Sequence, residues 1–303
     1  MTVSIAHAAA PTEIVIEGER VFPESLTSTA DGTVIIGSIG ARTIYRAEHG
    51  SSRATAWILP DTDGLHNILG VLADDTSNTL WVCSSTLPQK NGPPPLPAAL
   101  HAFNLRTGAP KAHYLFPTDG SLCNDISVAG DGTVYATDST NMEVVRLQRG
   151  AKFMEVWAGN GDFGPKDGVV DGITVLGNRV LVNALAESKL YSVPIQANGN
   201  AGTVVEVKLN RPIDRPDGMR RFGKNSVLVV EGGHGGRLSL VKLNGDTGTA
   251  TTLKEGYPDW PVAVTTVGTV AYVLEGQFTA FFNNSDTAEL KPFRATAVTV
   301  GKP

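Results

Sequence analysis

The stretch NDISVAGDGTVYATD (residues 124–138) has the pattern of a β-hairpin, in which two β-rich segments flank a turn that carries Asp131 and Gly132. Asp and Gly favour tight turns between antiparallel strands. The stretch ESLTSTADGTVIIGS (24–38) aligns with it without a gap and repeats Asp-Gly-Thr-Val at the same place. Two aligned hairpins predict a protein built from structural repeats.

Four further copies follow the same plan. They are DGITVLGNRVLVNA (171–184), DGMRRFGKNSVLVVEGG (217–233, with one inserted residue), ILGVLADDTSNTLWVCSS (68–85) and VAVTTVGTVAYVLEG (262–276). One or two more short β-rich segments follow each copy, and no long window keeps a helical period. Six units at spacings of roughly 40 to 55 residues predict an all-β, six-bladed β-propeller with four-stranded blades around a central channel.

A β-sandwich is the alternative all-β fold, but it would not explain repeats that run in one direction with the same hairpin at a fixed place. We predict a single domain over residues 1–303 with a flexible N-terminus (1–12). Either EIVIEGERVF (13–22) or FRATAVTV (293–300) could supply an outer strand of the last blade. The proline-rich segment 85–103 has the length and stiffness of a lid over the channel mouth, with a plain surface loop as the alternative.

Composition limits the classes of partner. The net charge is −5 and Lys and Arg form no cluster, so the chain lacks the electrostatic footprint of a nucleic-acid or anionic-membrane binder. The longest apolar runs are far shorter than the ~20 residues of a membrane-spanning helix. We therefore expect a small-molecule partner and a monomer. The small residues near the start leave the localisation open between a secreted or periplasmic protein and a cytoplasmic one.

Two cysteines, Cys83 and Cys123, are too few for a disulfide framework or a cysteine metal cage. We predict that they are two small buried hydrophobic residues.

The residue that opens each repeat is predicted to lie on the channel rim, because the first strand of each propeller blade lines the channel. The six rim positions are Glu24, Ile68, Asn124, Asp171, Asp217 and Val262. Four carry side-chain oxygens, and three carboxylates that converge on one axis repel one another unless a cation holds them. For any one residue alone, the alternative is a turn former that caps the start of a strand.

Oxygen donors without Cys, and without a His pair at ligand spacing, favour a hard divalent cation. We expect Ca²⁺ at the rim, with Mg²⁺, Mn²⁺ or Zn²⁺ as alternatives. His234, in EGGHGGRL (231–238), is placed to hydrogen-bond a substrate or carry a proton, and a flexible surface turn is the alternative. His66, two residues before a rim position, is a second candidate. The other histidines, His7, His49, His101 and His113, lack comparable placement.

Glu at the first rim position, Asn-Asp at 124–125 and Pro-Asp-Gly at 216–218, in this order, resemble the senescence marker protein and gluconolactonase (regucalcin-like) family. The resemblance covers about residues 20 to 285, and it implies a six-bladed propeller with one divalent metal in its channel. It also implies that Glu24, Asp171 and Asp217 bind the metal directly and that Asn124 contacts the metal or its water and substrate. Family members are typically lactone hydrolases, with relatives among paraoxonase-like and strictosidine synthase-like propellers.

The chain departs from this family at two positions. Asp171 stands where the family usually has Asn, which adds a negative charge beside the metal. Leu122 stands where sugar-lactone members carry an Arg that contacts the substrate, so a more apolar ester or lactone is favoured. Asp138 opens a turn of the predicted pocket wall and joins Asn124, Leu122 and His66 as a candidate for binding the substrate.

The resemblance and the rim together predict metal-dependent hydrolysis of a lactone or related ester. Asp217 is the first candidate for the base that takes a proton from water, and Asp171 is the second. The alternatives are a non-hydrolytic propeller enzyme, either condensing or isomerising, and a binding protein on the same scaffold. The sequence contains no G-x-S-x-G, Walker, dinucleotide or zincin motif.

Overall fold

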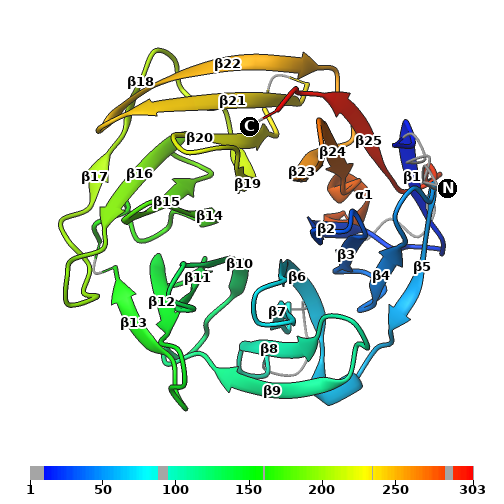
Figure 1. The fold of residues 1–303 in the computed structure, drawn as a ribbon, viewed down its shortest axis with the longest axis horizontal. Helices are drawn as coiled ribbons and strands as arrows, with labels where there is room; N and C mark the ends of the chain where they lie inside the picture. Colours follow the sequence, from blue (N-terminus) through cyan, green and yellow to red (C-terminus); the bar gives the residue numbers. More distant parts are fainter. Residues whose placement is uncertain (1–9, 88–94, 160, 234, 284–288, 303) are drawn as a thin grey trace, which may run out of the picture.

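The computed structural model is a ring of short strands around a central axis, which confirms the all-β prediction (Figure 1). The structure describes residues 10–87, 95–159, 161–233, 235–283 and 289–302. The second, third and fourth repeats each form a four-stranded antiparallel sheet. These sheets contain β6 (Asn67–Asp74), β7 (Thr79–Ser85), β8 (Ala99–Asn104) and β9 (Pro110–Leu115); β10 (Cys123–Val128), β11 (Val134–Asp138), β12 (Glu143–Leu147) and β13 (Glu155–Ala158); β14 (Val170–Leu176), β15 (Arg179–Ala184), β16 (Lys189–Pro194) and β17 (Val205–Glu206).

The fifth repeat forms a five-stranded sheet in the order β18-β22-β21-β20-β19. Its strands are β18 (Lys208–Leu209), β19 (Pro216–Arg221), β20 (Ser226–Glu231), β21 (Arg237–Asn244) and β22 (Thr247–Glu255). The described helical segments are short, η1 (Thr62–Gly64) and α1 (Phe278–Phe282). Among the residues described, no helix has both the length and the apolar character needed to span a bilayer.

The first and last repeats share one eight-stranded sheet, in the order β2-β3-β4-β5-β1-β25-β24-β23. Its strands are β1 (Glu13–Ile16), β2 (Pro23–Ser28), β3 (Val34–Ser38), β4 (Ile44–Ala47), β5 (Arg53–Ile58), β23 (Pro261–Val267), β24 (Val270–Glu275) and β25 (Arg294–Thr299). β1 pairs antiparallel with β25 and parallel with β5. Both segments considered for the closing strand therefore contribute, and β1 joins the two ends of the ring.

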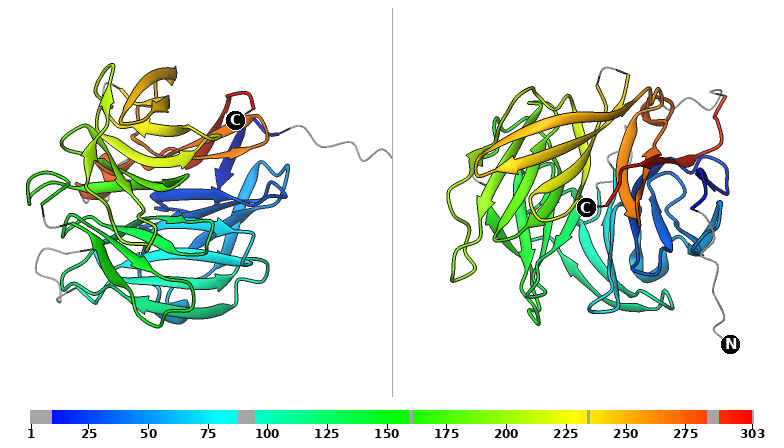
Figure 2. Two further views of the ribbon diagram at one scale, coloured as in Figure 1. Left: turned by 60° about the vertical axis from the view of Figure 1, so that its left-hand side comes forward. Right: turned by 45° about the horizontal axis from the view of Figure 1, so that its top comes forward.

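The first strand of every repeat lies nearest the axis. Figure 1 shows β2, β6, β10, β14, β19 and β23 around the central opening, with later strands of each repeat further out. Figure 2 shows the same ring from two oblique directions, with β25 beside β24 and close to β1.

The hydrophobic core lies between neighbouring sheets. One cluster packs Ile35 and Ile44 of the first repeat against Ile68 and Val82 of the second. Further clusters join the third repeat to the fourth, the fourth to the fifth and the fifth to the sixth. Because each sheet buries both of its faces in this way, the strands nearest the axis are held at fixed positions.

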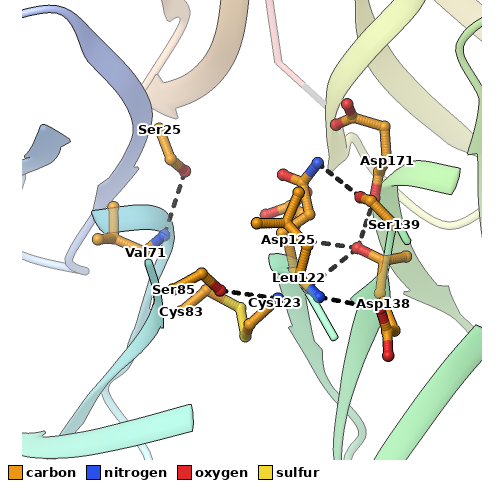
Figure 3. The surroundings of a disulfide bond; sticks show 12 residues. Ser25, Val71, Cys83, Ser85, Leu122, Cys123, Asp125, Asp138, Ser139 and Asp171 are labelled. Atoms are coloured by element: carbon orange, nitrogen blue, oxygen red, sulfur yellow. Dashed lines mark hydrogen bonds between the residues drawn. A yellow bond between two sulfur atoms is a disulfide. The ribbon is translucent and has the colours of Figure 1, made fainter. Parts of the chain in front are cut away.

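The two cysteines form a disulfide bond between neighbouring sheets, so the prediction of two separate buried residues is wrong. Cys83 lies on β7 and Cys123 on β10, 40 residues later in the chain, and both are fully buried. The backbone N–H of Cys123 also donates to Ser85 Oγ at 3.0 Å (Figure 3). Disulfides are typical of proteins in oxidising compartments.

Two peripheral segments differ in extent from the sequence-based boundaries. Residues 1–9 lie outside the described residues, whereas the carbonyls of Pro11 and Thr12 accept hydrogen bonds from Tyr272 Oη and Ala297 N. The connection between β7 and β8 comprises residues 86–98, because 85 and 99–103 belong to strands. Its central part, 88–94, lies outside the described residues, so the lid stays a prediction.

Candidate functional site

The six predicted rim residues occupy equivalent places in the structure, because each is the second residue of an inner strand. In each inner strand the pairing register with the next strand shifts close to this residue. Such an irregularity locally frees a strand from strict alternation and re-aims a side chain. The local backbone therefore interrupts the regular alternation of side chains between the two sheet faces at these residues.

Three of the rim residues converge on one point. Glu24, Asp171 and Asp217 each offer a carboxylate oxygen, and these oxygens lie within 4.8 Å of one another. The residues come from β2, β14 and β19, and they are only 7%, 6% and 5% exposed. Buried carboxylates this close together have no counterpart in an ordinary core, where charges are paired.

Asn124 is held beside this cluster by its amide nitrogen, and its amide oxygen has no hydrogen-bond partner among the described residues. Its Nδ2 donates to Ser139 Oγ at 2.9 Å, and that hydroxyl donates to the Val170 carbonyl at 2.6 Å. These bonds define which end of the amide carries nitrogen. Its Oδ1 is buried and has no hydrogen-bond partner among the described residues. A buried amide oxygen left in this way is available to a cation or a bound molecule.

The electrostatics of the cluster favour either retained protons or a bound cation at neutral pH. Burial, and then the charge of Asp125, raise the pKa of Asp171 to about 7. Burial and the neighbouring carboxylates also raise the pKa values of Glu24 and Asp217 well above their ordinary range. Without a cation, the three groups therefore retain protons at pH values where carboxylates are normally ionised.

The donor chemistry fits a hard divalent cation. Three carboxylates and one amide oxygen are the ligand types of Ca²⁺ and Mg²⁺, which bind through oxygen. The unpartnered Oδ1 of Asn124 and the raised pKa values of the carboxylates are both relieved by a cation among them. The residues therefore fit the metal that the sequence predicts.

A buried ion pair below the rim was not predicted from the sequence. Arg220 Nη1 donates to both oxygens of Asp125, at 3.1 and 2.8 Å. Its Nη2 reaches Ser25 Oγ at 3.4 Å and the Val71 carbonyl at 3.3 Å. Asp125 Oδ2 also accepts from Ile173 N at 3.3 Å. The pair thus ties five inner strands together directly beneath the carboxylates.

One signal in the sequence could have identified Arg220. It stands three residues after the rim position of its repeat, where the aligned copies carry small hydroxyl residues or Val. The six aligned residues are Thr27, Val71, Ser127, Thr174, Arg220 and Thr265. A single long cation among such residues indicates a group that crosses the channel.

A large cavity lies on the far side of this ion pair from the rim. It has a volume of about 700 Å³, and its lining includes Thr27, Ser127, Thr174, Arg220 and Thr265. Among the residues described, its lining includes none of the four rim donors. We place the candidate site at the rim rather than in this cavity, because the rim holds the buried carboxylates and the unpartnered oxygen.

The other predicted site residues have different surroundings. Asp138 is fully buried, and its oxygens accept from the backbone N–H of Leu122 at 3.0 Å and from both nitrogens of Asn141. This carboxylate therefore holds the turn that leads into Asn124, and Leu122 is half-buried beside it. The backbone of His66 donates to Ser84 Oγ at 2.8 Å.

His234 lies outside the described residues, so its role stays a prediction. Figure 3 shows how the rim is supported: Asp171 and Ser139 lie together, and the disulfide anchors the strand that carries Asp125.

Several solved structures share this fold at low sequence identity. A gluconolactonase from Xanthomonas campestris is 11% identical, with a TM-score of 0.65 over 93% of this chain and 87% of that one. A luciferin-regenerating enzyme is 10% identical, with a TM-score of 0.65 over 94% of each chain. Virginiamycin B lyase from Staphylococcus aureus is 14% identical, with a TM-score of 0.59 over 95% of this chain and 98% of that one.

No protein-family model matches the chain, and a search of curated proteins finds no match. At these identities the likeness concerns the fold. At that level, the resemblance to gluconolactonase-like propellers is confirmed.

Proposed function

We propose that this protein is a six-bladed β-propeller enzyme that uses one divalent cation at its rim to hydrolyse an apolar lactone or related ester. The sheet topology supports six blades, because the eight-stranded sheet divides into β2–β5 and the set β23, β24, β25 and β1. With the four other sheets, this division gives six strand groups around one axis (Figure 1).

The observation that carries the proposal is the convergence of four buried oxygen donors from four repeats. Glu24, Asp171 and Asp217 would hold the cation, with Asn124 Oδ1 as a fourth donor or as a contact to substrate. Ca²⁺ is the first candidate, and Mg²⁺, Mn²⁺ and Zn²⁺ follow. When bound, such a cation polarises a carbonyl and stabilises the negative charge that develops on its oxygen.

The chain supplies the remaining chemistry. Asp217 accepts the proton of the attacking water, and Asp171 is the second candidate for this base. Asp138 and Ser139 hold the strand start so that Asn124 keeps its orientation. The Asp125–Arg220 pair crosses the channel below the carboxylates, and we place the substrate on the rim side of it.

Apolar residues near the rim support an apolar substrate. Five partly buried hydrophobic residues pack against the core at the rim ends of the repeats. Two follow a second strand by two or three residues, two directly precede a first strand, and one lies in α1. The five residues are Ala41, Leu87, Leu122, Trp260 and Phe281. Their side chains fit an acyl or aromatic group better than the hydroxyls of a sugar lactone.

The test is hydrolysis of a lactone panel, from sugar lactones to apolar aromatic and acyl lactones, followed with a pH indicator. The protein is stripped of metal and refilled with Ca²⁺, Mg²⁺, Mn²⁺ or Zn²⁺. We expect turnover of apolar lactones that disappears on stripping and returns with one ion. Silence across the panel with the metal still bound would instead support a non-hydrolytic enzyme on this scaffold, as in the lyase of similar fold.

Asp217→Ala tests the assignment of the rim residues. We expect loss of both the bound metal and turnover, because a central carboxylate of the cluster is removed. Asp131→Ala is the matched control, since this exposed carboxylate lies in the hairpin turn at the opposite end of its repeat. Full metal content in Asp217→Ala, measured by elemental analysis, would contradict the assignment. The binding-protein alternative instead predicts that the rim carboxylates are dispensable, so that loss of the metal changes stability but no activity.

A further inference from the structure

A second group of metal-binding side chains lies away from the rim, on the second repeat. His101 on β8 and His113 on β9 are directly opposite each other in the paired strands. Asp63, in the short turn η1 that precedes β6, lies against both. The sequence predicts no role for these two histidines, because their pairing depends on strand register rather than on spacing along the chain.

The two distances from Asp63 match tetrahedral coordination. Asp63 Oδ2 lies 3.4 Å from His101 Nδ1 and 3.5 Å from His113 Nδ1, and the three donor atoms lie within 4.8 Å of one another. Ligands bound to zinc at about 2.0–2.2 Å are about 3.3–3.5 Å apart in a tetrahedron. The Asp63 contacts therefore already have the length of a tetrahedral edge, and only the two rings must adjust.

The surroundings hold one ligand rigidly and leave the others accessible. His101 is 3% exposed, and its ring stacks on Phe103 with a centroid distance of 6.1 Å. The rings of His101 and His113 are 5.5 Å apart. The side chains of His113 and Asp63 are 53% and 26% exposed, so an ion can enter from solvent.

We propose that Asp63, His101 and His113 form a second metal site that binds Zn²⁺ or a chemically similar transition metal, with a fourth position open to water. Two imidazoles and one carboxylate suit this class of ion, whereas the rim offers oxygen atoms alone. The bound ion would fasten the turn that links the first repeat to the second onto β8 and β9. This proposal does not depend on the function assigned to the rim.

The experiment is equilibrium dialysis of stripped protein against Zn²⁺ in the presence of saturating Ca²⁺, followed by elemental analysis of the protein. His113→Ala and Asp63→Asn are the test variants, because both side chains are partly exposed and their loss spares the core. His49→Ala is the matched control, since His49 is an exposed histidine on the first repeat. We expect both test variants to bind one zinc ion fewer per chain than the wild type and the control.

Co²⁺ in place of Zn²⁺ gives a second readout, because tetrahedral and octahedral cobalt absorb visible light differently. The wild type should show the tetrahedral spectrum, and His113→Ala should lose it. Equal zinc contents in the wild type and both test variants would overturn the proposal. A wild type that takes up no zinc under these conditions would overturn it as well.

Discussion

Asp171 brings a third carboxylate into a buried cluster, and the stability of the metal-free protein should therefore depend on pH. Burial, and then the charge of Asp125, raise its pKa from the ordinary value of 3.8 to about 7. The folded state thus binds this proton more tightly than the unfolded state does. The resulting stability is fully present below the unfolded pKa and is lost as the pH rises through the folded pKa.

We expect the melting temperature of metal-stripped protein to fall between about pH 4 and about pH 8. Metal should reverse the trend, because it binds the ionised carboxylates and protons compete with it. Asp171→Asn, which cannot ionise, should flatten the pH dependence of the stripped protein and retain the rim metal. Thermal melts of both proteins across this pH range, with and without metal, provide the check. Identical slopes for the wild type and Asp171→Asn would contradict the assignment of the effect to Asp171.

The Asp125–Arg220 pair is a second determinant of stability at the residue scale, because Asp125 is only 4% exposed and its charge needs a partner. Arg220→Met should destabilise the protein by about 3–5 kcal/mol, since it leaves a buried carboxylate without its partner. It should also weaken metal binding near neutral pH, because Arg220 lowers the pKa of Glu24.

The double variant Arg220→Met/Asp125→Asn distinguishes two causes of the lost stability, the unpaired charge of Asp125 and the lost packing of the Arg220 side chain. Removing the orphaned charge should recover a large part of the stability in urea unfolding. A double variant that is less stable than Arg220→Met would argue that packing, not charge, explains the loss.

At the scale of strands, the rim was predictable because each repeat keeps its first residue at a similar distance from the hairpin turn. The alignment of 24–38 with 124–138 places Glu24 and Asn124 at the same step of their strands, and the structure agrees. The register shift near each rim residue has no such signal in the sequence. Contacts between different repeats were also not predictable, because they depend on which strands become neighbours.

The disulfide is one such contact, and it predicts a measurable contribution to stability. Cys83 and Cys123 are 40 residues apart, and closing a loop of this length restricts the unfolded chain by about 4 kcal/mol in the chain-entropy description. Cys83→Ala/Cys123→Ala should lower the free energy of unfolding by up to this amount.

The same variant should also bind the rim metal less tightly, because the disulfide ends directly before Asn124 on β10. Urea unfolding and metal titration of the variant measure the two effects, and the wild type under reducing conditions is the comparison. If the variant and the reduced wild type were both as stable as the oxidised wild type, the disulfide would not constrain the fold in solution.

At the scale of the whole molecule, one short strand joins the two ends of the ring. The sequence offered two segments for closure without deciding between them, because both have the pattern of an outer strand. The structure uses both, and β1 pairs with β25 of the last repeat on one side and with β5 of the first repeat on the other. Val15 N donates to the Ser52 carbonyl at 2.9 Å, and Ile16 N donates to the Phe293 carbonyl at 2.9 Å.

This arrangement predicts that the two buried side chains of β1 are critical for stability. Ile14 and Ile16 are each 2% exposed and belong to the core cluster that contains Tyr272 and Phe293. Replacing either with Ala should cost about 2–5 kcal/mol, because a buried aliphatic group is removed from a packed site. Val15→Ala is the matched control, since Val15 is only half-buried on the other face of the strand. If Val15→Ala and Ile16→Ala unfolded at the same urea concentration, β1 would not close the ring through its buried face.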